Sequence, residues 1–149
     1  MLGMSRRSLK KCVDEARVVQ AIQAAERASS GEIRVSVATY FWGDVEKAAR
    51  RAFVRLGMDR TAQHNGVLIF LVPSRRRFTV LGDTGIHAAV GQEFWKDVAG
   101  TLSEHFKRSE FTEGLERGIA KVGERLAEHF PWQGDADLNE LPDEVDYGG

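Results

Sequence analysis

Apolar and polar residues follow two different periods along the chain, and the periods predict which segments are helices and which are strands. Apolar side chains recur at intervals of three and four in four segments, residues 13–28, 45–56, 93–107 and 111–130. This spacing is typical of one face of an amphipathic helix. Asp44 is suited to cap the second segment, and Gly57 and Pro131 end the second and fourth. We therefore expect four helices.

Three shorter segments have the pattern of β-strands. Residues 33–38 alternate between apolar and polar side chains, which predicts a strand with one face more buried than the other. Residues 67–72 are apolar at every position, which is typical of a central strand covered on both faces. After a short turn at residues 73–76, the alternation returns over residues 77–81, and the Gly-Asp-Thr-Gly sequence at residues 82–85 ends that strand.

The order of these segments predicts an α/β fold, an α/β/α sandwich with a small mixed sheet covered by helices on both faces. The first two strands flank a helix, so they should be parallel, with a right-handed crossover. The short turn before the third strand makes it antiparallel to the second. This topology brings the start of strand one (Glu32), the start of strand two (His64, Asn65) and the end of strand three (Asp83) to one edge.

Composition indicates one globular domain with an acidic tail. The length of 149 residues, with 42% hydrophobic and 29% charged residues, suits a single domain. Residues 131–149 contain six acidic residues and no lysine or arginine, while the rest of the chain has 21 basic and 16 acidic residues. We divide the chain into an N-terminal extension (1–12), the α/β domain (13–130) and an acidic tail (131–149) that we expect to be disordered.

The sequence favours a cytoplasmic location. The single cysteine, Cys12, excludes an internal disulfide and a cysteine-rich zinc site. The longest apolar run, residues 67–72, is far shorter than the ~20 residues of a membrane span. No apolar stretch follows the basic N-terminal residues to form a signal-peptide core. We expect no membrane span and no nucleic-acid partner. The acidic tail can fold back on the mildly basic body, repel polyanions or simply aid solubility.

The first candidate site is the carboxylate edge of the predicted sheet. Glu32, Asp59 and Asp83 lie on separate loops and can converge on a calcium or magnesium ion, which prefers oxygen ligands. His87 is near enough in sequence to act as an acid or base, and a bound ion would polarise a phosphorylated small molecule. The alternative is purely local structure, with aspartates in turns and Glu32 paired with an arginine. Both interpretations stay open.

The second candidate site is the opposite edge, which collects aromatic and basic residues. They are Tyr40, Phe41 and Trp42 before Asp44, and the arginine turn Arg75, Arg76 and Arg77. Arginine recognises phosphate, and exposed aromatic residues anchor protein partners. The alternative is that the arginines keep a tight turn soluble, Trp42 closes the core and Asp44 only caps a helix.

The strand segments together resemble the TPM domain family, also called TPM phosphatase. The segments are Ser-Gly-Glu-Ile-Arg-Val at residues 30–35, Asn-Gly-Val-Leu-Ile-Phe-Leu at 65–71 and Arg-Phe-Thr-Val at 77–80, with Gly82 and Asp83 after them. The resemblance covers roughly residues 13–130, and the tail at 139–145 is similar to a small soluble bacterial branch. It implies an α/β/α sandwich, in agreement with the hydrophobic pattern.

The resemblance also implies a calcium-binding aspartate cluster and phosphatase activity, as in some relatives. The family's cluster draws on the helix start after strand one, which corresponds to Asp44. Its second position falls near Gln92 and Glu93, and His87 stands where many relatives carry a glutamate.

Together, the residues and the resemblance predict a divalent-cation-binding domain with possible weak phosphatase activity. The expected catalytic residues are Asp83 and His87, and the expected metal ligands are Glu32, Asp44, Asp59 and Asp83. The alternative is a non-catalytic protein-interaction module that uses the Tyr40 to Trp42 edge and the acidic tail.

Overall fold

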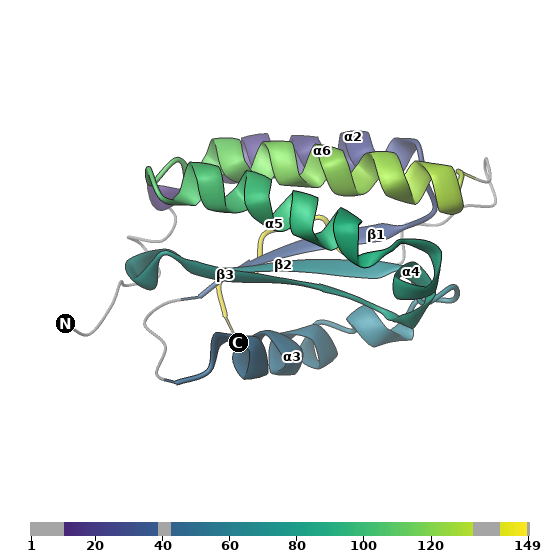
Figure 1. Ribbon diagram of the computed structural model, residues 1–149, viewed down its shortest axis with the longest axis horizontal. Coiled ribbons are helices and arrows are strands. Elements are labelled where there is room, and N and C mark those ends of the chain that lie inside the picture. Colours follow the sequence, from purple (N-terminus) through teal and green to yellow (C-terminus); the bar gives the residue numbers. More distant parts are fainter. Residues whose placement is uncertain (1–10, 39–42, 133–140, 149) are drawn as a thin grey trace.

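The computed structural model describes residues 11–38, 43–132 and 141–148, and it has the predicted architecture of a sheet between two layers of helices (Figure 1). The strands are β1 (Glu32–Val37), β2 (Gly66–Val72) and β3 (Arg77–Gly82). One face is covered by α2 (Glu15–Arg27), α5 (Gln92–Phe106) and α6 (Phe111–His129), and the other by α3 (Val45–Arg55). The short helices are η1 (Met58–Arg60), η2 (Pro73–Arg75) and α4 (Thr84–Ala89).

The sheet topology matches the prediction. The strand order is β1-β2-β3, with β1 parallel and β3 antiparallel to β2. Glu32 pairs with Gly66, and Val67 pairs with Gly82. The start of β1, the start of β2 and the end of β3 therefore lie at one end of the sheet, as the sequence indicates.

Two hydrophobic cores form because successive residues of a strand point to opposite faces. Ile69 of β2 belongs to the core shared with α2, α5 and α6, whereas Leu68 and Phe70 belong to the smaller core beneath α3. Every residue of β2 is buried, as expected for a central strand. Among the helices that the structure describes, none is long and apolar enough to cross a membrane.

Helix α4 is absent from the prediction, which has only a break at residues 82–85. The Asp83 carboxylate caps this helix by accepting a hydrogen bond from the Thr84 N–H at 2.8 Å. The helix has six residues, and Ile86 is its buried residue. So short a segment contains too few apolar positions to display a helical period.

Residues 141–148, for which we expected disorder, lie along the outer edge of β1, and we call them the C-terminal strap. The Val37 N–H donates to the Asp146 carbonyl at 2.7 Å, and the Asp146 N–H donates to the Val35 carbonyl at 2.9 Å. Val145 and Tyr147 are buried in the larger core. Backbone pairing and two buried apolar side chains contribute to holding this acidic segment on the sheet.

The C-terminal strap also explains why β1 is buried on both faces, although its sequence alternates. Arg34 and Ser36 were expected on the more exposed face, and both are buried. Arg34 Nη2 donates to the Glu144 carbonyl at 3.2 Å, and Ser36 Oγ donates to the Asp146 carboxylate at 2.8 Å. These bonds give Ser36 Oγ and one Arg34 nitrogen a partner, whereas Arg34 Nε is buried with no hydrogen-bond partner among the described residues.

Candidate functional site

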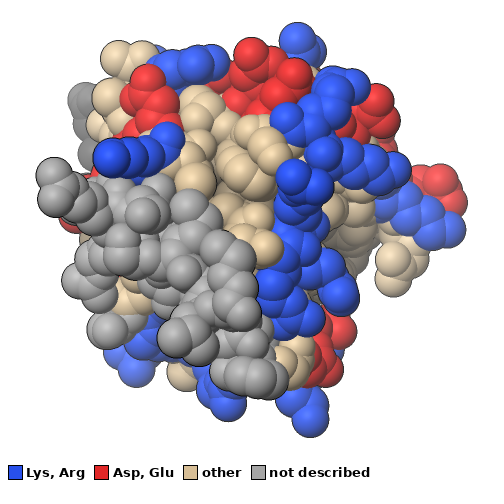
Figure 2. All heavy atoms as spheres, turned by 90° about the vertical axis from the view of Figure 1, so that its left-hand side faces the viewer, with Lys and Arg blue, Asp and Glu red and all other residues tan. Residues whose placement is uncertain are grey.

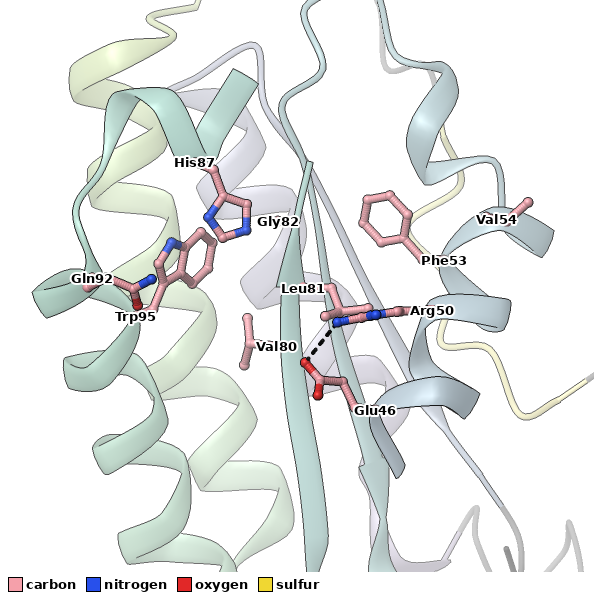
Figure 3. Close-up of a pocket in the computed structure, with 10 residues that line it drawn as sticks. All are labelled: Glu46, Arg50, Phe53, Val54, Val80, Leu81, Gly82, His87, Gln92 and Trp95. Carbon is pink, nitrogen blue, oxygen red and sulfur yellow. Dashed lines mark hydrogen bonds and ion pairs between the residues drawn. The ribbon is translucent and has the colours of Figure 1, made fainter. Parts of the chain in front are cut away.

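A groove with a volume of about 540 Å³ runs along β3, the strand at the open side of the sheet (Figure 3). Its floor is β3, and its walls are α3 on one side and α4 with α5 on the other. The lining residues are Glu46, Arg50, Phe53 and Val54 of α3, Val80, Leu81 and Gly82 of β3, and His87, Gln92 and Trp95. The volume is in the range of binding pockets for small ligands or short peptides.

The backbone of β3 contributes hydrogen-bonding groups to this groove. The Asp83 N–H donates to the Gly66 carbonyl at 2.9 Å. This bond shows which residues along β3 form backbone hydrogen bonds with β2. In an antiparallel pair, every second residue bonds to the neighbouring strand and the others point away from it. By this register, Phe78, Val80 and Gly82 direct their N–H and C=O groups away from β2. An edge of this kind can accept a further strand.

The groove has an apolar wall on each side. Trp95 of α5 lies against β3 because Gly82 has no side chain; a Cβ there would be 2.7 Å from the indole ring. On the α3 side, Phe53 is partly buried and Val54 is 56% exposed. The Trp95 Nε1 is buried and has no hydrogen-bond partner among the described residues. A buried donor left unsatisfied costs about 1–3 kcal/mol, which a ligand acceptor reaching it would recover.

The polar residues of the groove are few and largely exposed. Arg50 pairs with Glu46 at 3.4 Å, but their side chains are 69% and 57% exposed, so the pair adds little stability. The ring of His87 lies 5.2 Å from that of Trp95. Glu46 is the one carboxylate among the ten lining residues. The groove therefore suits recognition of backbone and apolar groups.

Two of the predicted site residues lie in or beside this groove. His87 is on its wall, and Asp83 is the cap of α4 just beyond β3. The Asp83 carboxylate is 3.1 Å from His64 Nδ1, so the structure brings together two residues of the predicted edge. Glu32 is buried at the start of β1, two strands away, a separation of roughly 10 Å at the usual strand spacing.

The other predicted metal ligands lie apart. Asp59 is exposed in η1. Asp44 caps α3 by accepting the Glu46 N–H at 2.8 Å, and it lies beside the β2–β3 turn, because Arg75 donates to the Gly43 carbonyl at 3.1 Å. Asp44 is therefore at the opposite end of the sheet from Asp83. Metal binding by these carboxylates stays a prediction.

The predicted aromatic and basic edge is described in part. Tyr40, Phe41 and Trp42 lie outside the described residues. Arg76 and Arg77 are exposed at the β2–β3 turn, and Figure 2 shows a band of basic side chains across this end of the molecule. Gln92 and Glu93, which correspond to the second family position, are exposed at the start of α5.

A different set of potential metal ligands is absent from the prediction. Within the described ranges, one group of three such residues has a ligand atom from each within 4.8 Å of the others: His105, Glu110 and Glu113. Their order in the sequence, at the end of one helix and the start of the next, is a weak signal. Only the conformation of the turn between the helices brings them together.

Two acidic residues, Glu26 of α2 and Asp143 of the C-terminal strap, lie together where the strap meets α2. Burial raises the pKa of Glu26 to about 10, and a hydrogen bond with Asp143 and the charge of nearby Glu32 act in the same direction. The Ile33 N–H, which donates to Glu26 Oε2 at 3.0 Å, acts in the opposite direction. Glu26 is therefore protonated at neutral pH and ties α2 to the strap.

Comparison with known proteins places the chain among TPM-domain structures. A family model described as TPM domain matches residues 11–125. The NMR structure of the BA42 protein from the psychrophilic bacterium Bizionia argentinensis is similar, with 39% sequence identity, a TM-score of 0.85, and coverage of 91% of this chain and 92% of that one. A search of curated proteins gave no significant match.

Two further solved structures share the fold at low sequence identity. The N-terminal domain of the cg2496 protein from Corynebacterium glutamicum has 13% identity and a TM-score of 0.59, with coverage of 89% of this chain and 77% of that chain. The N-terminal domain of a protein from P. gingivalis has 18% identity and a TM-score of 0.63, with coverage of 89% and 99%.

Proposed function

This chain belongs to the TPM domain family, as its strand segments predict, and we propose that it is a binding domain whose groove along β3 takes an extended segment of another protein. The observation that carries the proposal is the open edge of β3 between two partly apolar walls. Addition of a strand to a sheet edge is a common mode of peptide recognition, with backbone bonds giving affinity and side-chain pockets giving specificity.

The depth of the groove favours a single extended segment over the sheet edge of a folded domain. The β3 edge is flanked by α3 on one side and by α4 and α5 on the other (Figure 3). A second domain that offered its own edge strand would bring its covering helices against these walls. A peptide has no such layers, so it can reach the outward groups of Phe78, Val80 and Gly82.

The two walls would contact alternate side chains of the bound segment, because successive residues of a strand point to opposite faces. Residues facing α5 would contact Trp95 and His87, and residues facing α3 would contact Phe53 and Val54. Each backbone hydrogen bond contributes about 0.5–1.5 kcal/mol net. Filling the apolar walls is therefore needed for affinity, and we expect dissociation constants of roughly 1–10 μM.

Selection of peptides tests this proposal. Random eight-residue peptides displayed on phage are selected against the full-length protein, and their affinities are measured by fluorescence anisotropy. We expect selected peptides to alternate apolar residues. The Val80→Pro variant loses an outward N–H but no bond to β2, and edge strands tolerate proline. We expect it to weaken binding at least about 10-fold, since it also obstructs strand pairing.

A second variant keeps the test valid if Val80→Pro does not fold. Val54 is 56% exposed, so Val54→Asp should leave the fold intact while placing a charge on the α3 wall. Arg27→Gln, on the exposed surface of α2, is the matched control and should bind like the wild type. Unchanged affinity of the selected peptides in both groove variants would contradict the proposal.

Metal-dependent phosphatase activity at Asp83 and His87, with calcium or magnesium, is the competing proposal. It is supported by the resemblance to the family and by the position of the Asp83–His64 pair beside the groove. The test is phosphate release from an aryl phosphate in millimolar calcium or magnesium. Release that is lost in Asp83→Asn would favour hydrolysis, and no release by the wild type would count against it.

A further inference from the structure

The turn between α5 and α6 joins a histidine and two glutamates at the end of the molecule that Figure 2 faces, where acidic and basic side chains lie side by side. His105 is in the last turn of α5, Glu110 is at the N-cap position of α6 without a side-chain capping bond, and Glu113 is in the first turn of α6. His105 Nδ1 lies 3.0 Å from Glu110 Oε1. One ligand atom from each residue lies within 4.8 Å of the others.

The backbone holds these side chains in place. Ser109 has a left-handed conformation (φ 59°), and the Glu110 N–H donates to the His105 carbonyl at 3.0 Å, which closes the turn. Gly114 lets the first turn of α6 approach α5, since a Cβ there would be 2.9 Å from His105 Cβ and 2.7 Å from the Phe106 ring. The His105 side chain is only 12% exposed, so its position is largely fixed.

We propose that His105, Glu110 and Glu113 form a binding site for a divalent transition-metal ion of the zinc class. One imidazole nitrogen and two carboxylates suit zinc better than calcium or magnesium, which prefer ligand sets made of oxygen alone. The two carboxylates balance the charge of the ion. The metal would bind between His105 Nδ1 and Glu110 Oε1, and the neutral imidazole would carry its proton on Nε2.

The geometry requires only a small adjustment. Metal–ligand distances of about 2.0–2.2 Å place the ligands of a tetrahedral zinc ion roughly 3.4 Å apart. Glu113 is exposed, so rotation of its side chain can bring its carboxylate closer. His105 also lines a cavity of about 420 Å³ together with Thr101, Glu104 and Lys121, which gives a fourth ligand, such as water, access to this region.

Arg108 opposes metal binding in this structure. Its guanidinium contacts Glu110 Oε1 at 3.2 Å and Glu104 at 3.2 Å. A metal ion bound to Glu110 must therefore compete with the Arg108 charge. Removal of that charge should strengthen zinc binding.

A zinc titration of the full-length, tag-free protein tests the proposal by calorimetry and by ¹⁵N NMR of the histidine rings. We expect one zinc ion per chain with a micromolar dissociation constant and a shift of the His105 nitrogens. His105→Asn should weaken binding at least about 10-fold, and Arg108→Gln should tighten it by about 3-fold or more. His129→Asn changes an exposed histidine at the other end of α6 and should bind zinc like the wild type.

Glu113→Gln keeps the test decisive if His105→Asn does not fold, because Glu113 is exposed and its loss should also weaken zinc binding. Three outcomes would overturn the proposal: zinc affinity that is unchanged in both variants, a shift of His64 or His87 in place of His105, or a stronger response to calcium or magnesium than to zinc. These outcomes are independent of peptide binding at the β3 groove.

Discussion

Glu26 retains a proton at pH values where exposed glutamates have lost theirs. Burial, the hydrogen bond with Asp143 and the charge of Glu32 raise its pKa to about 10. In the unfolded chain a glutamate ionises near pH 4.3. Between these two values the folded state binds more protons at this position than the unfolded state does, so the free energy of unfolding must decrease as the pH rises.

The Glu26→Gln variant should remove this pH dependence. The raised pKa of Glu26 gives a contribution to stability that is full below about pH 4.5 and declines as the pH rises towards about 10. The free energy of unfolding of the wild type should therefore fall relative to that of Glu26→Gln between pH 5 and pH 9, measured by urea denaturation. The exposed Glu128→Gln should follow the wild type. A difference between the wild type and Glu26→Gln that is constant over this range would argue against a buried proton.

Asp146 shows the opposite behaviour within the C-terminal strap. Burial alone would raise its pKa, but hydrogen bonds from Arg55 at 2.8 Å and from Ser36 at 2.8 Å outweigh that effect and lower it. Its contribution to stability is therefore present above the unfolded pKa and is lost as the pH falls through the folded pKa. At the scale of the element, the C-terminal strap is held by Glu26 in its neutral form and by Asp146 in its charged form.

Shortening the side chains of the C-terminal strap should destabilise the whole domain. Tyr147 is buried to 9% exposure, and Tyr147→Ala should lower the free energy of unfolding by about 2–4 kcal/mol. Tyr147→Phe keeps the ring but loses the hydroxyl hydrogen bond to Glu15, and it should lose about 1 kcal/mol. Urea denaturation at pH 7 measures both variants, and equal stability of Tyr147→Ala and the wild type would show that the strap is not attached.

The sequence predicts the elements with a long repeating pattern and misses those without one. Helices α2, α3, α5 and α6 and strands β1 and β2 match their predicted segments because each buries a continuous apolar face. Strand β3 also matches its segment, although its residues are exposed or only partly buried. Helix α4 buries mainly Ile86, and the strap buries Val145 and Tyr147 among acidic residues. Both depend on contacts with distant parts of the chain, which a local pattern does not contain.

At the scale of the whole molecule, the candidate sites also differ in whether the sequence predicts them. The end of the sheet shared by Glu32 and Asp83 follows from strand order alone, so it is predictable. The groove depends on how Trp95 packs over Gly82, and the His105 cluster depends on one left-handed turn residue. Side-chain packing and turn conformation are set by the assembled fold, so the sequence pattern gives little sign of either site.

The register of the sheet predicts a pattern of amide hydrogen exchange that can be measured without a ligand. Amide hydrogens of β2 lie between two strands and under two cores, so Ile69 and Phe70 should exchange slowly with solvent. Phe78 and Val80 direct their N–H groups away from β2 and should exchange much faster than the alternate residues Thr79 and Leu81. Hydrogen exchange followed by NMR measures this alternation. Similar protection of Thr79 and Val80 would contradict the register.

The two lateral edges of the sheet differ, and this limits the addition of further strands. One lateral side is terminated by the chain's own C-terminal strap, and the other is recessed between α3 and the α4–α5 wall. Stacking of copies into a fibril needs two accessible sheet edges per subunit, and the described part of the sheet leaves one, along β3. We therefore expect a strand-like ligand to bind the β3 edge with 1:1 stoichiometry.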